Sequence, residues 1–322
     1  MNSVSRSRCF VAGHRGLVGS AIVRLLETTG YESLILRTRA ELDLMDQAAV
    51  KRFFADEKPD AVFFAAAKVG GIKANDTYRW SFLFENLVIE TNVLGAALDA
   101  GVERLVFLGS SCIYPRLAPQ PIRERDLLTG ELEPTNEPYA IAKIAGLKLV
   151  EAANSQHGRK WVSLMPTNLY GPNDNFDPET SHVLPAMIRK FHEAKEARLE
   201  GRDAVVSLWG HGRARREFLH VDDAARAAVM MMESGETGLY NVGYGSDLEI
   251  RELAALVGRV VGYDGPVEWD TSKPDGTPRK LLDSTLLRER GWEPRITLED
   301  GIRSTYEWYV ASREAQLARQ GT

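Results

Sequence analysis

Short apolar runs alternate with helical patterns through the first half of the chain, and this alternation constrains the fold most strongly. The apolar runs lie at residues 8–13, 32–38, 60–67 and 104–111, and the helical patterns between them at 16–30, 47–59 and 81–101. Strands separated by helices of this length favour a parallel sheet with right-handed crossovers. We therefore expect an α/β protein built on a doubly wound parallel sheet of the Rossmann type.

The second half of the chain departs from this pattern after Pro172. A polar loop, a helix and a mixture of short segments follow, so we expect residues 173–322 to form a smaller α/β domain beside a first domain at residues 1–172. Residues 220–245 contain one further helical pattern and one strand pattern. We expect that segment to rejoin the sheet of the first domain.

Composition and charge exclude several classes of protein. The 322 residues are 44% hydrophobic and 26% charged, and no apolar run is long enough to span a membrane. The first eight residues lack an apolar signal core, and two cysteines do not suggest a disulfide framework. We therefore expect a cytoplasmic protein. Its net charge of −5 argues against nucleic acid or an anionic membrane as a partner.

A glycine-rich loop, "GHRGLVG", joins the first predicted strand to the first predicted helix. Its residues are Gly13, His14, Arg15, Gly16, Leu17, Val18 and Gly19. Glycines in this position let the backbone approach a pyrophosphate, whose charge is met by amides at the helix N-terminus. The loop therefore indicates a dinucleotide site, although a tight strand-to-helix turn would give similar spacing.

The end of the second predicted strand indicates which dinucleotide is bound. An acidic residue there holds the ribose 2′-hydroxyl of NAD, whereas an arginine accommodates the 2′-phosphate of NADP. This strand ends with Arg37 and Arg39, and Arg15 lies inside the glycine loop. Guanidinium groups suit phosphate. We therefore predict that residues 1–172 bind NADP(H), with Arg39 at the phosphate.

Tyr139 and Lys143 lie four residues apart in a helical pattern and so share one face of the helix. The spacing alone is common, but it becomes specific after a glycine-rich strand–turn–helix unit and with Ser110 at the end of a strand. We expect Lys143 to lower the pKa of Tyr139, which would then exchange protons with a substrate. Ser110 would hydrogen-bond a substrate oxygen.

Cys112 follows Ser110 in the run "FLGSSCIYP". If this run continues as a strand, Ser110, Cys112 and Tyr114 point to the same face, and a hydroxyl and a thiol share one cavity. A single cysteine is more often an inert apolar residue. Cys9, on the first predicted strand, is expected in the core.

The chain resembles the extended short-chain dehydrogenase/reductases, through "GHRGLVG", "GSSCIYP" and "YAIAK". Longer blocks resemble the members that make GDP-L-fucose: "AGHRGLVGSAI", "AAAKVGGI", "LGSSCIYP", "LEPTNEPYAIAKIAG", "MPTNLYGPNDNF", "REFLHVDD" and "SKPDGTPRKLLD". This resemblance implies that GDP-4-keto-6-deoxy-D-mannose is epimerised at C3 and C5 and then reduced at C4 by NADPH. It implies no metal.

The resemblance also assigns roles to individual residues. Cys112 and His182 would be the acid and base at carbon, in an order that the sequence leaves open. The cofactor contacts that it implies are Leu108, Gly109, Ser110, Ser111, Lys143, Pro166, Thr167, Asn168, Leu169 and His182. The contacts to the GDP-sugar would be Lys190, Trp209, Arg216, Asp275 and Lys280, all in the second domain. Lys190 departs from the family, where an arginine is expected, and loses the bidentate fork.

Two other functions remain open from the sequence. One is a nucleotide-sugar 4-epimerase or 4,6-dehydratase of the same superfamily, and the other is a non-catalytic NADP-sensing protein. The resemblance further implies a homodimer, paired through the helical segments at residues 81–100 and 140–154. Their apolar faces would suit a four-helix seam, although burial inside one subunit gives similar spacing.

Overall fold

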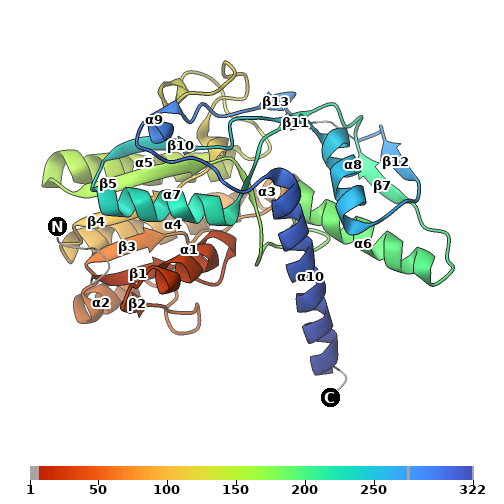
Figure 1. Cartoon of the computed structure of the whole chain (residues 1–322). Coiled ribbons are helices and arrows are strands. Elements are labelled where there is room, and N and C mark those ends of the chain that lie inside the picture. The colour runs from red at the N-terminus through yellow and green to blue at the C-terminus, as the bar shows by residue number, and fades with distance from the viewer. Residues whose placement is uncertain (1–6, 274–275, 321–322) are drawn as a thin grey trace.

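The computed structural model describes residues 7–273 and 276–320, and its largest element is a six-stranded parallel sheet (Figure 1). The strand order is β10-β5-β4-β3-β1-β2, and each neighbouring pair is parallel. These strands are β1 (Arg8–Ala12), β2 (Ser33–Ile35), β3 (Ala61–Phe64), β4 (Arg104–Leu108), β5 (Lys160–Pro166) and β10 (Gly238–Val242). The predicted doubly wound α/β fold is confirmed.

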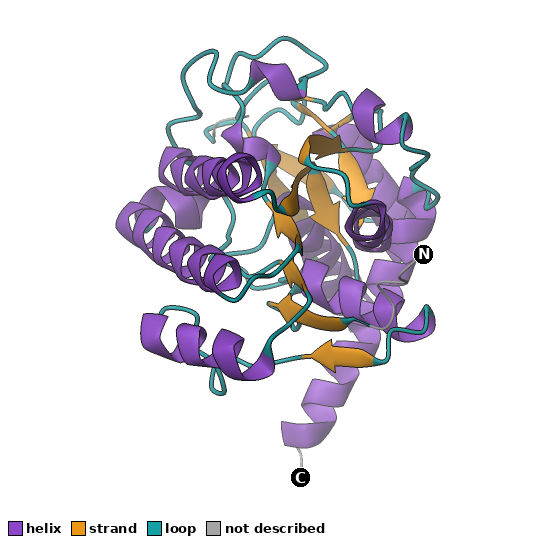
Figure 2. Ribbon diagram, turned by 90° about the vertical axis from the view of Figure 1, so that its left-hand side faces the viewer, coloured by secondary structure: helices purple, strands orange, loops and turns teal. Residues whose placement is uncertain are grey.

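Helices cover both faces of this sheet (Figure 2). The helices α1 (Leu17–Thr28) and α7 (Val221–Ser234) pack on one face. The other face is covered by α2 (Gln47–Glu57), α4 (Arg79–Asp99) and α5 (Glu137–His157). Parallel strands buried on both faces read as continuous apolar runs, as these do. A short helix, α3 (Ile72–Thr77), precedes α4 and was not predicted from the sequence.

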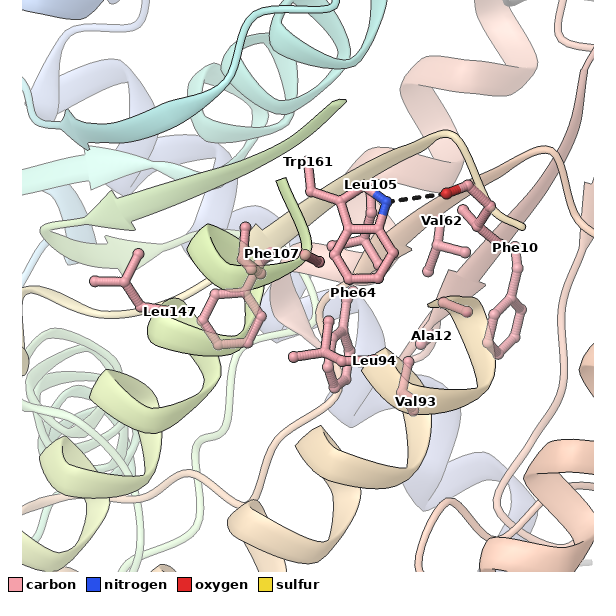
Figure 3. Close-up of a cluster of buried hydrophobic side chains, with 14 of the residues drawn as sticks. Phe10, Ala12, Val62, Phe64, Val93, Leu94, Leu105, Phe107, Leu147 and Trp161 are labelled. Carbon is pink, nitrogen blue, oxygen red and sulfur yellow. Dashed lines mark hydrogen bonds between the residues drawn. The ribbon is translucent and has the colours of Figure 1, made fainter. Parts of the chain in front are cut away.

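Aromatic side chains fill the core between the sheet and α4 and α5 (Figure 3). The rings of Phe64 and Phe107 pack edge to face with centroids 5.7 Å apart. The indole of Trp161 is buried, and its Nε1 donates to the carbonyl of Val102 at 3.1 Å. Each such ring removes a large apolar area from water, on the order of 150 to 250 Å². This packing fixes β4 and α5, which carry the residues of the candidate site.

The second half of the chain forms a separate apolar core beyond the strand ends, on the other side of the molecule in Figure 1. Its helices are α6 (Val183–Leu199), α8 (Ile250–Val261) and α10 (Leu298–Gln320). Its strand pairs are β7 (Val206–Trp209) with β12 (Val267–Asp270), and β6 (Asn168–Tyr170) with β9 (Phe218–His220). This half also contains a three-stranded sheet, in which β8 (Arg215–Arg216) lies between β11 (Leu248–Glu249) and β13 (Arg279–Lys280). The short helix α9 (Thr285–Arg288) packs instead against β10, in the core of the six-stranded sheet.

Two predicted strands end earlier than their apolar runs suggest. The run at residues 104–111 leaves the sheet at Leu108, and Ser111–Ile113 forms a turn of 3₁₀-helix, η2. A second such turn, η3, covers Glu124–Asp126. The segment "KWVSLMPTNLYGP" at residues 160–172 also reads as one strand in the sequence, but it divides at Thr167 into β5 and β6, which belong to different sheets. Within the described residues, no helix is both long and apolar enough to cross a bilayer.

Candidate active site

A cavity of about 680 Å³ opens at the carboxyl ends of β1, β3, β4 and β5, where ligands bind in open parallel sheets. It brings together most of the residues that the sequence singled out. Those that line it are Gly13, Gly16, Leu17, Val18, Arg39, Gly109, Ser110, Ser111, Cys112, Tyr139, Pro166, Thr167, Asn168, Leu169 and His182. Residues from segments far apart in the sequence therefore converge on one site.

The glycine loop packs so closely that side chains would not fit. A Cβ on Gly19 would lie 2.1 Å from the carbonyl oxygen of Gly13, and one on Gly13 would lie 2.8 Å from the amide of Ala66. Gly13 also has a φ of 83°, in the region that favours glycine. The first residues of α1 line the cavity, and its first turn contains no acidic residue. The positive end of the helix dipole is therefore available to a pyrophosphate.

The arginines near this loop differ in their surroundings. Arg39 is exposed at the cavity, and its Nε lies 3.8 Å from Asp43. Arg37 also lines the cavity, but its guanidinium forms an ion pair with Glu57 and lies over the ring of Phe53. Arg15 is exposed at the turn. Arg39 is therefore the cation best placed to meet a phosphate. Neither Arg15 nor His14 is among the lining residues.

Tyr139 and Lys143 occupy successive turns of α5, at different depths. Tyr139 lines the cavity, whereas Lys143 lies beneath it with 2% of its surface exposed. The ammonium of Lys143 donates to the carbonyl of Leu108 at 3.1 Å and lies 3.1 Å from a carboxylate oxygen of Glu90. Its Nζ is 6.0 Å from the centre of the Tyr139 ring.

The expected lowering of the Tyr139 pKa is wrong for this structure. Burial raises the pKa of Tyr139, and the negative charges of Cys112 and Glu90 add to the rise. A hydrogen bond with the side chain of Ser110 opposes it. The sequence does not reveal how deeply the phenol is buried, or that Cys112 and Glu90 lie near enough to oppose the effect of Lys143. Tyr139 is therefore a neutral phenol at neutral pH.

Ser110 and Cys112 do share the cavity, but not because they alternate along a strand. The Oγ of Ser110 accepts from the amide of Cys112 at 3.2 Å and caps the η2 turn. This turn brings both side chains to the cavity. Tyr114 points elsewhere, since it is buried and its hydroxyl donates to Asn241 Oδ1 at 2.6 Å. The predicted shared face of all three residues is therefore wrong for Tyr114.

Polar groups surround the sulfur of Cys112. The Nδ2 of Asn136 lies 3.3 Å from Sγ, and the Nζ of Lys280 lies 3.7 Å from it. Cys9, by contrast, is fully buried in β1, and burial raises the pKa of its thiol to about 12. The two cysteines therefore differ in kind: Cys112 faces charged and polar groups at a cavity, and Cys9 belongs to the core.

His182 reaches the same cavity from the N-terminus of α6. The protein atoms around its ring lower the pKa of His182, so the neutral imidazole predominates near neutral pH. The loop before it is attached to the first half of the chain, because the amide of Gly71 donates to the carbonyl of Thr180 at 3.0 Å. A Cβ on Gly71 would lie 2.7 Å from the carbonyl oxygen of Ser181, so this approach requires glycine.

The segment from Pro166 to Leu169 lies between the two halves of the molecule. Asn168 Nδ2 donates to the carbonyl of Glu217 at 2.8 Å, and Thr167 Oγ1 donates to the same oxygen at 3.3 Å. Beneath the cavity, Gly109 packs against the buried side chain of Met165 on the neighbouring strand, whose Cε would lie 2.2 Å from an added Cβ. Leu108 does not line the cavity and contributes through its carbonyl, which binds Lys143.

Four predicted substrate contacts lie outside the lining of this cavity. Arg216 and Lys280 are paired in the register of β8 and β13, so the two cations stand side by side. Trp209, at the end of β7, is 58% exposed, and Lys190 donates to the nearby carbonyl of Ser207 at 2.8 Å. Asp275 lies outside the described residues.

The sequence analysis did not identify several residues of the site. Lys68 and Glu85 form an ion pair at the cavity wall, and Glu90 pairs with Lys143 beneath it. Asp174 also lines the cavity, and burial raises its pKa to about 7. The only signal for Glu90 in the sequence is a charged residue within the largely apolar helical pattern "FENLVIETNVLG", and that pattern does not indicate its partner.

No cluster of three or more His, Cys, Asp or Glu side chains in the described part of the chain is arranged to hold a metal ion. The site therefore combines a glycine-rich cradle, a Ser–Tyr–Lys group, a thiol and an imidazole.

Comparison with known proteins places this geometry in a family. Residues 9–243 match the sequence pattern of the family described as "NAD dependent epimerase/dehydratase family". The chain is 58% identical to GDP-L-fucose synthase 1 of Arabidopsis thaliana over 94% of this chain and 93% of that protein. It is 56% identical to GDP-L-fucose synthase of Escherichia coli K12 over 97% and 99% of the two chains.

A solved structure supports the same assignment. MlghC, a GDP-mannoheptose C4 reductase from Campylobacter jejuni with NADP bound, superimposes with a TM-score of 0.86 and 37% identity. The match covers 95% of this chain and 99% of that one. The chain therefore belongs to the NAD dependent epimerase/dehydratase family.

Proposed function

We propose that this enzyme converts GDP-4-keto-6-deoxy-D-mannose to GDP-L-fucose, by epimerisation at C3 and C5 followed by reduction of the C4 ketone with NADPH. The observation that carries the proposal is the presence of two sets of proton-transfer groups in one cavity. Ser110 and Tyr139 suit the ketone oxygen, and Cys112 and His182 supply the further acid and base that epimerisation needs. The identity of 56% to 58% with named GDP-L-fucose synthases supports the same substrate.

The residues at the strand ends fit NADP(H). The close approach at Gly13 and Gly19 makes a cradle that any Cβ would fill, and Arg39 provides a cation for the 2′-phosphate. Ser111 and the Pro166–Leu169 segment line the part of the cavity beyond Gly109 and would contact the nicotinamide. When bound, the reduced cofactor supplies the hydride. The relative MlghC, whose structure holds NADP, supports this choice.

The epimerisations require proton removal from one face of the sugar and proton return to the other. A carbon next to a ketone is acidic because the resulting enolate places its charge on the ketone oxygen. Ser110 and Tyr139 would donate hydrogen bonds to that oxygen and stabilise the charge. An acid and a base that act on opposite faces of the sugar have to approach it from different directions. Cys112 and His182 fit this requirement because they come from separate segments, η2 and the loop before α6.

The reduction requires one further proton at the C4 oxygen. Tyr139 is the donor, because its pKa is raised and it carries its proton at neutral pH. Lys143 lies beneath the ring and stabilises the phenolate that forms when the proton leaves. The hydroxyl of Ser110 lies near that of Tyr139 and lowers its pKa, in opposition to the larger effect of burial.

The GDP part of the substrate would bind to the second half of the chain. Arg216 and Lys280 stand together next to Cys112 and would offset the diphosphate, with Trp209 available to stack on a base. Lys190 and Asp275 complete the proposed contacts. In this division residues 1–172, with 220–245, form the cofactor domain, and the rest of 173–322 forms the substrate domain. The protein would act in the cytoplasm.

We also propose that the enzyme is a homodimer paired through α4 and α5. Large apolar side chains stand on the outer faces of these two helices although the helices pack against each other within one chain. On α4, Trp80 is 75% exposed and Phe84 is 46% exposed, with their rings stacked 5.5 Å apart. On α5, Ile141 and Leu149 are 43% and 40% exposed. Together they form an apolar face that a second copy would cover.

Deuterium incorporation tests the proposed function. The wild-type protein and Cys112→Ser are each incubated with GDP-4-keto-6-deoxy-D-mannose and NADPH in deuterated water, and C3 and C5 are followed beside NADPH oxidation. We expect the wild type to incorporate deuterium at both carbons, and the variant to lose exchange while it still binds NADPH. Oxidation of NADPH by the wild type without exchange at either carbon would show a simple ketoreductase.

A further inference from the structure

Glu90 is a buried carboxylate on α4 that the proposed chemistry does not yet use. It is 1% exposed, and its Oε1 lies 3.1 Å from the Nζ of Lys143, which is 2% exposed. An ion pair in such an environment is costly to form, because both charges lose their hydration. A surface position would avoid that cost, so the pair points to a role beyond general stability.

The helix that carries Lys143 leaves space for this carboxylate. Gly146 lies one turn beyond Lys143 on α5, and a Cβ there would lie 2.6 Å from Glu90 Oε2 and 2.6 Å from Phe107 Cζ. Any larger residue would push the carboxylate away from the ammonium. The ammonium is further held by the carbonyl of Leu108 and lies 4.8 Å from the centre of the Phe107 ring.

We propose that Glu90 is a positioning residue that holds the Lys143 ammonium beneath Tyr139 and, by offsetting its charge, keeps Tyr139 as a proton donor. The inference rests on the proposed function, since only the reduction step needs that proton. A lone ammonium beside a phenol favours the phenolate, which is the proton-accepting form suited to oxidation. Burial raises the pKa of Glu90, the neighbouring Lys143 opposes that rise, and the ionised carboxylate, 3.1 Å from the ammonium, weakens this effect on the phenol. Glu90 therefore helps to keep Tyr139 in the protonated form that reduction of a ketone requires.

The charged groups around Tyr139 agree with this role. Lys143 faces it from its own helix, Glu90 from α4, and Cys112 from η2. Burial is the largest cause of the raised pKa of Tyr139, and the negative charges of Cys112 and then of Glu90 add to the rise. Farther out, beyond Phe82, Lys68 and Glu85 form an ion pair of their own.

The test is the pH dependence of the reductive step in Glu90→Gln. Single-turnover NADPH oxidation is measured after mixing NADPH into enzyme that already holds GDP-4-keto-6-deoxy-D-mannose. If Tyr139 is the donor, the rate should fall only above about pH 10, because the pKa of Tyr139 is raised above the ordinary value of a tyrosine. We expect this alkaline limb to move to lower pH by about 1 unit in Glu90→Gln, with the Kd of NADPH changed by less than about twofold. A limb that stays in place, or moves to higher pH, would overturn the proposal.

Two further variants cover the case in which Glu90→Gln does not fold. Glu90→Asp keeps the charge but withdraws it by one methylene, so its alkaline limb should lie between those of the wild type and the Gln variant. Gly146→Ala displaces the carboxylate without altering it and should shift the limb in the same direction. If both variants fold and the alkaline limb of neither one moves, Glu90 does not affect the protonation of Tyr139.

The wild-type measurements separate this inference from the function beneath it. If the wild type fails to oxidise NADPH with this ketone, the proposed function is wrong and the role of Glu90 falls with it. If the wild type turns over and only the shift is missing, the function stands and the role of Glu90 alone is wrong. Glu217→Gln serves as the control, because it also removes a buried carboxylate, one that accepts from the amides of Gly245 and Leu282 instead. The alkaline fall in the rate of Glu217→Gln should occur at the same pH as in the wild type.

Discussion

Lys280 directs its ammonium at the sulfur of Cys112, with Nζ and Sγ 3.7 Å apart across 168 residues of sequence. The contact exists because β13 lies beside β8 and carries Lys280 into register with Arg216. A cation at this distance stabilises a thiolate, the form in which cysteine accepts protons and attacks electrophiles. The same lysine that would meet the diphosphate thus also touches a proposed acid/base group.

Lys280→Met should slow the alkylation of Cys112 by iodoacetamide about fivefold near neutral pH, because the thiolate loses a neighbouring positive charge. Mass spectrometry of the modified peptide gives the rate for Cys112 separately from that of Cys9, which burial protects. Lys273→Met is the control, since that ammonium lies over Trp209 instead. Equal rates in Lys280→Met and the control would show that the contact does not affect the thiol.

Arg39→Ala should lower kcat/KM for NADPH about tenfold and leave that for NADH within about twofold, because only NADPH carries the 2′-phosphate. Arg37→Ala is the matched comparison. Arg37 is already paired with Glu57, so its loss should affect the cofactor preference less. Steady-state kinetics with both cofactors decide the matter, and an equal loss for NADPH and NADH in Arg39→Ala would exclude a phosphate contact.

Gly71→Ala should reduce deuterium exchange at the substrate carbons about tenfold without weakening NADPH binding. The added methyl would meet the carbonyl of Ser181 at 2.7 Å and move the loop that carries His182. Lys73→Ala removes the neighbouring ion pair with Glu179, whose side chains are 59% and 70% exposed. Such an exposed pair contributes little to stability because water and salt screen it, so exchange should be unchanged. Wild-type exchange in Gly71→Ala would show that this contact does not position His182.

Asp174→Asn should stabilise the protein at neutral and alkaline pH. Burial raises the pKa of Asp174 from 3.8 to about 7, so the folded state binds its proton more tightly than the unfolded state does. Wild-type stability is therefore highest below the unfolded pKa and falls as pH rises through the folded pKa. Urea unfolding should show the advantage of the Asn variant growing by about 1 to 3 kcal/mol between about pH 5 and pH 8. A difference that does not vary with pH would mean that Asp174 titrates normally.

Phe84→Glu should convert the proposed dimer to a monomer, because the charge would be buried in an apolar seam without a partner. Sedimentation velocity measures the change. Leu199→Glu, at an exposed leucine that ends α6, should leave the dimer intact. A wild-type protein that sediments as a monomer, or a Phe84→Glu protein that remains a dimer, would rule out pairing through α4.

The sequence predicts those parts of the site that depend on local geometry. Gly13 and Gly19 are predictable because backbone packed against backbone admits no side chain, and the alternation of strands and helices follows from burial on both faces of the sheet. Tyr139 and Lys143 share a helix, so their spacing alone places them on one face.

The parts that the sequence does not predict depend on contacts between distant segments. The partner of Lys143 is Glu90, which lies 53 positions earlier, on another helix, and nothing local to either residue indicates the pair. The run through Cys112 has the apolar character of a strand, but the cap that Ser110 provides turns it into a 3₁₀-helix. Tyr114 accordingly points to Asn241 rather than into the cavity.

The position of β10 in the sheet affects how the protein is made. This strand is the outer neighbour of β5, yet β5 ends at Pro166 and β10 ends only at Val242. During synthesis the ribosome must therefore add more than seventy residues, including α6 and α7, before the edge of β5 can be covered. Until then Trp161 and its neighbours belong to an open strand edge that other nascent chains could join. The outer edge of β5 is therefore the last part of this sheet to be covered as the chain is made.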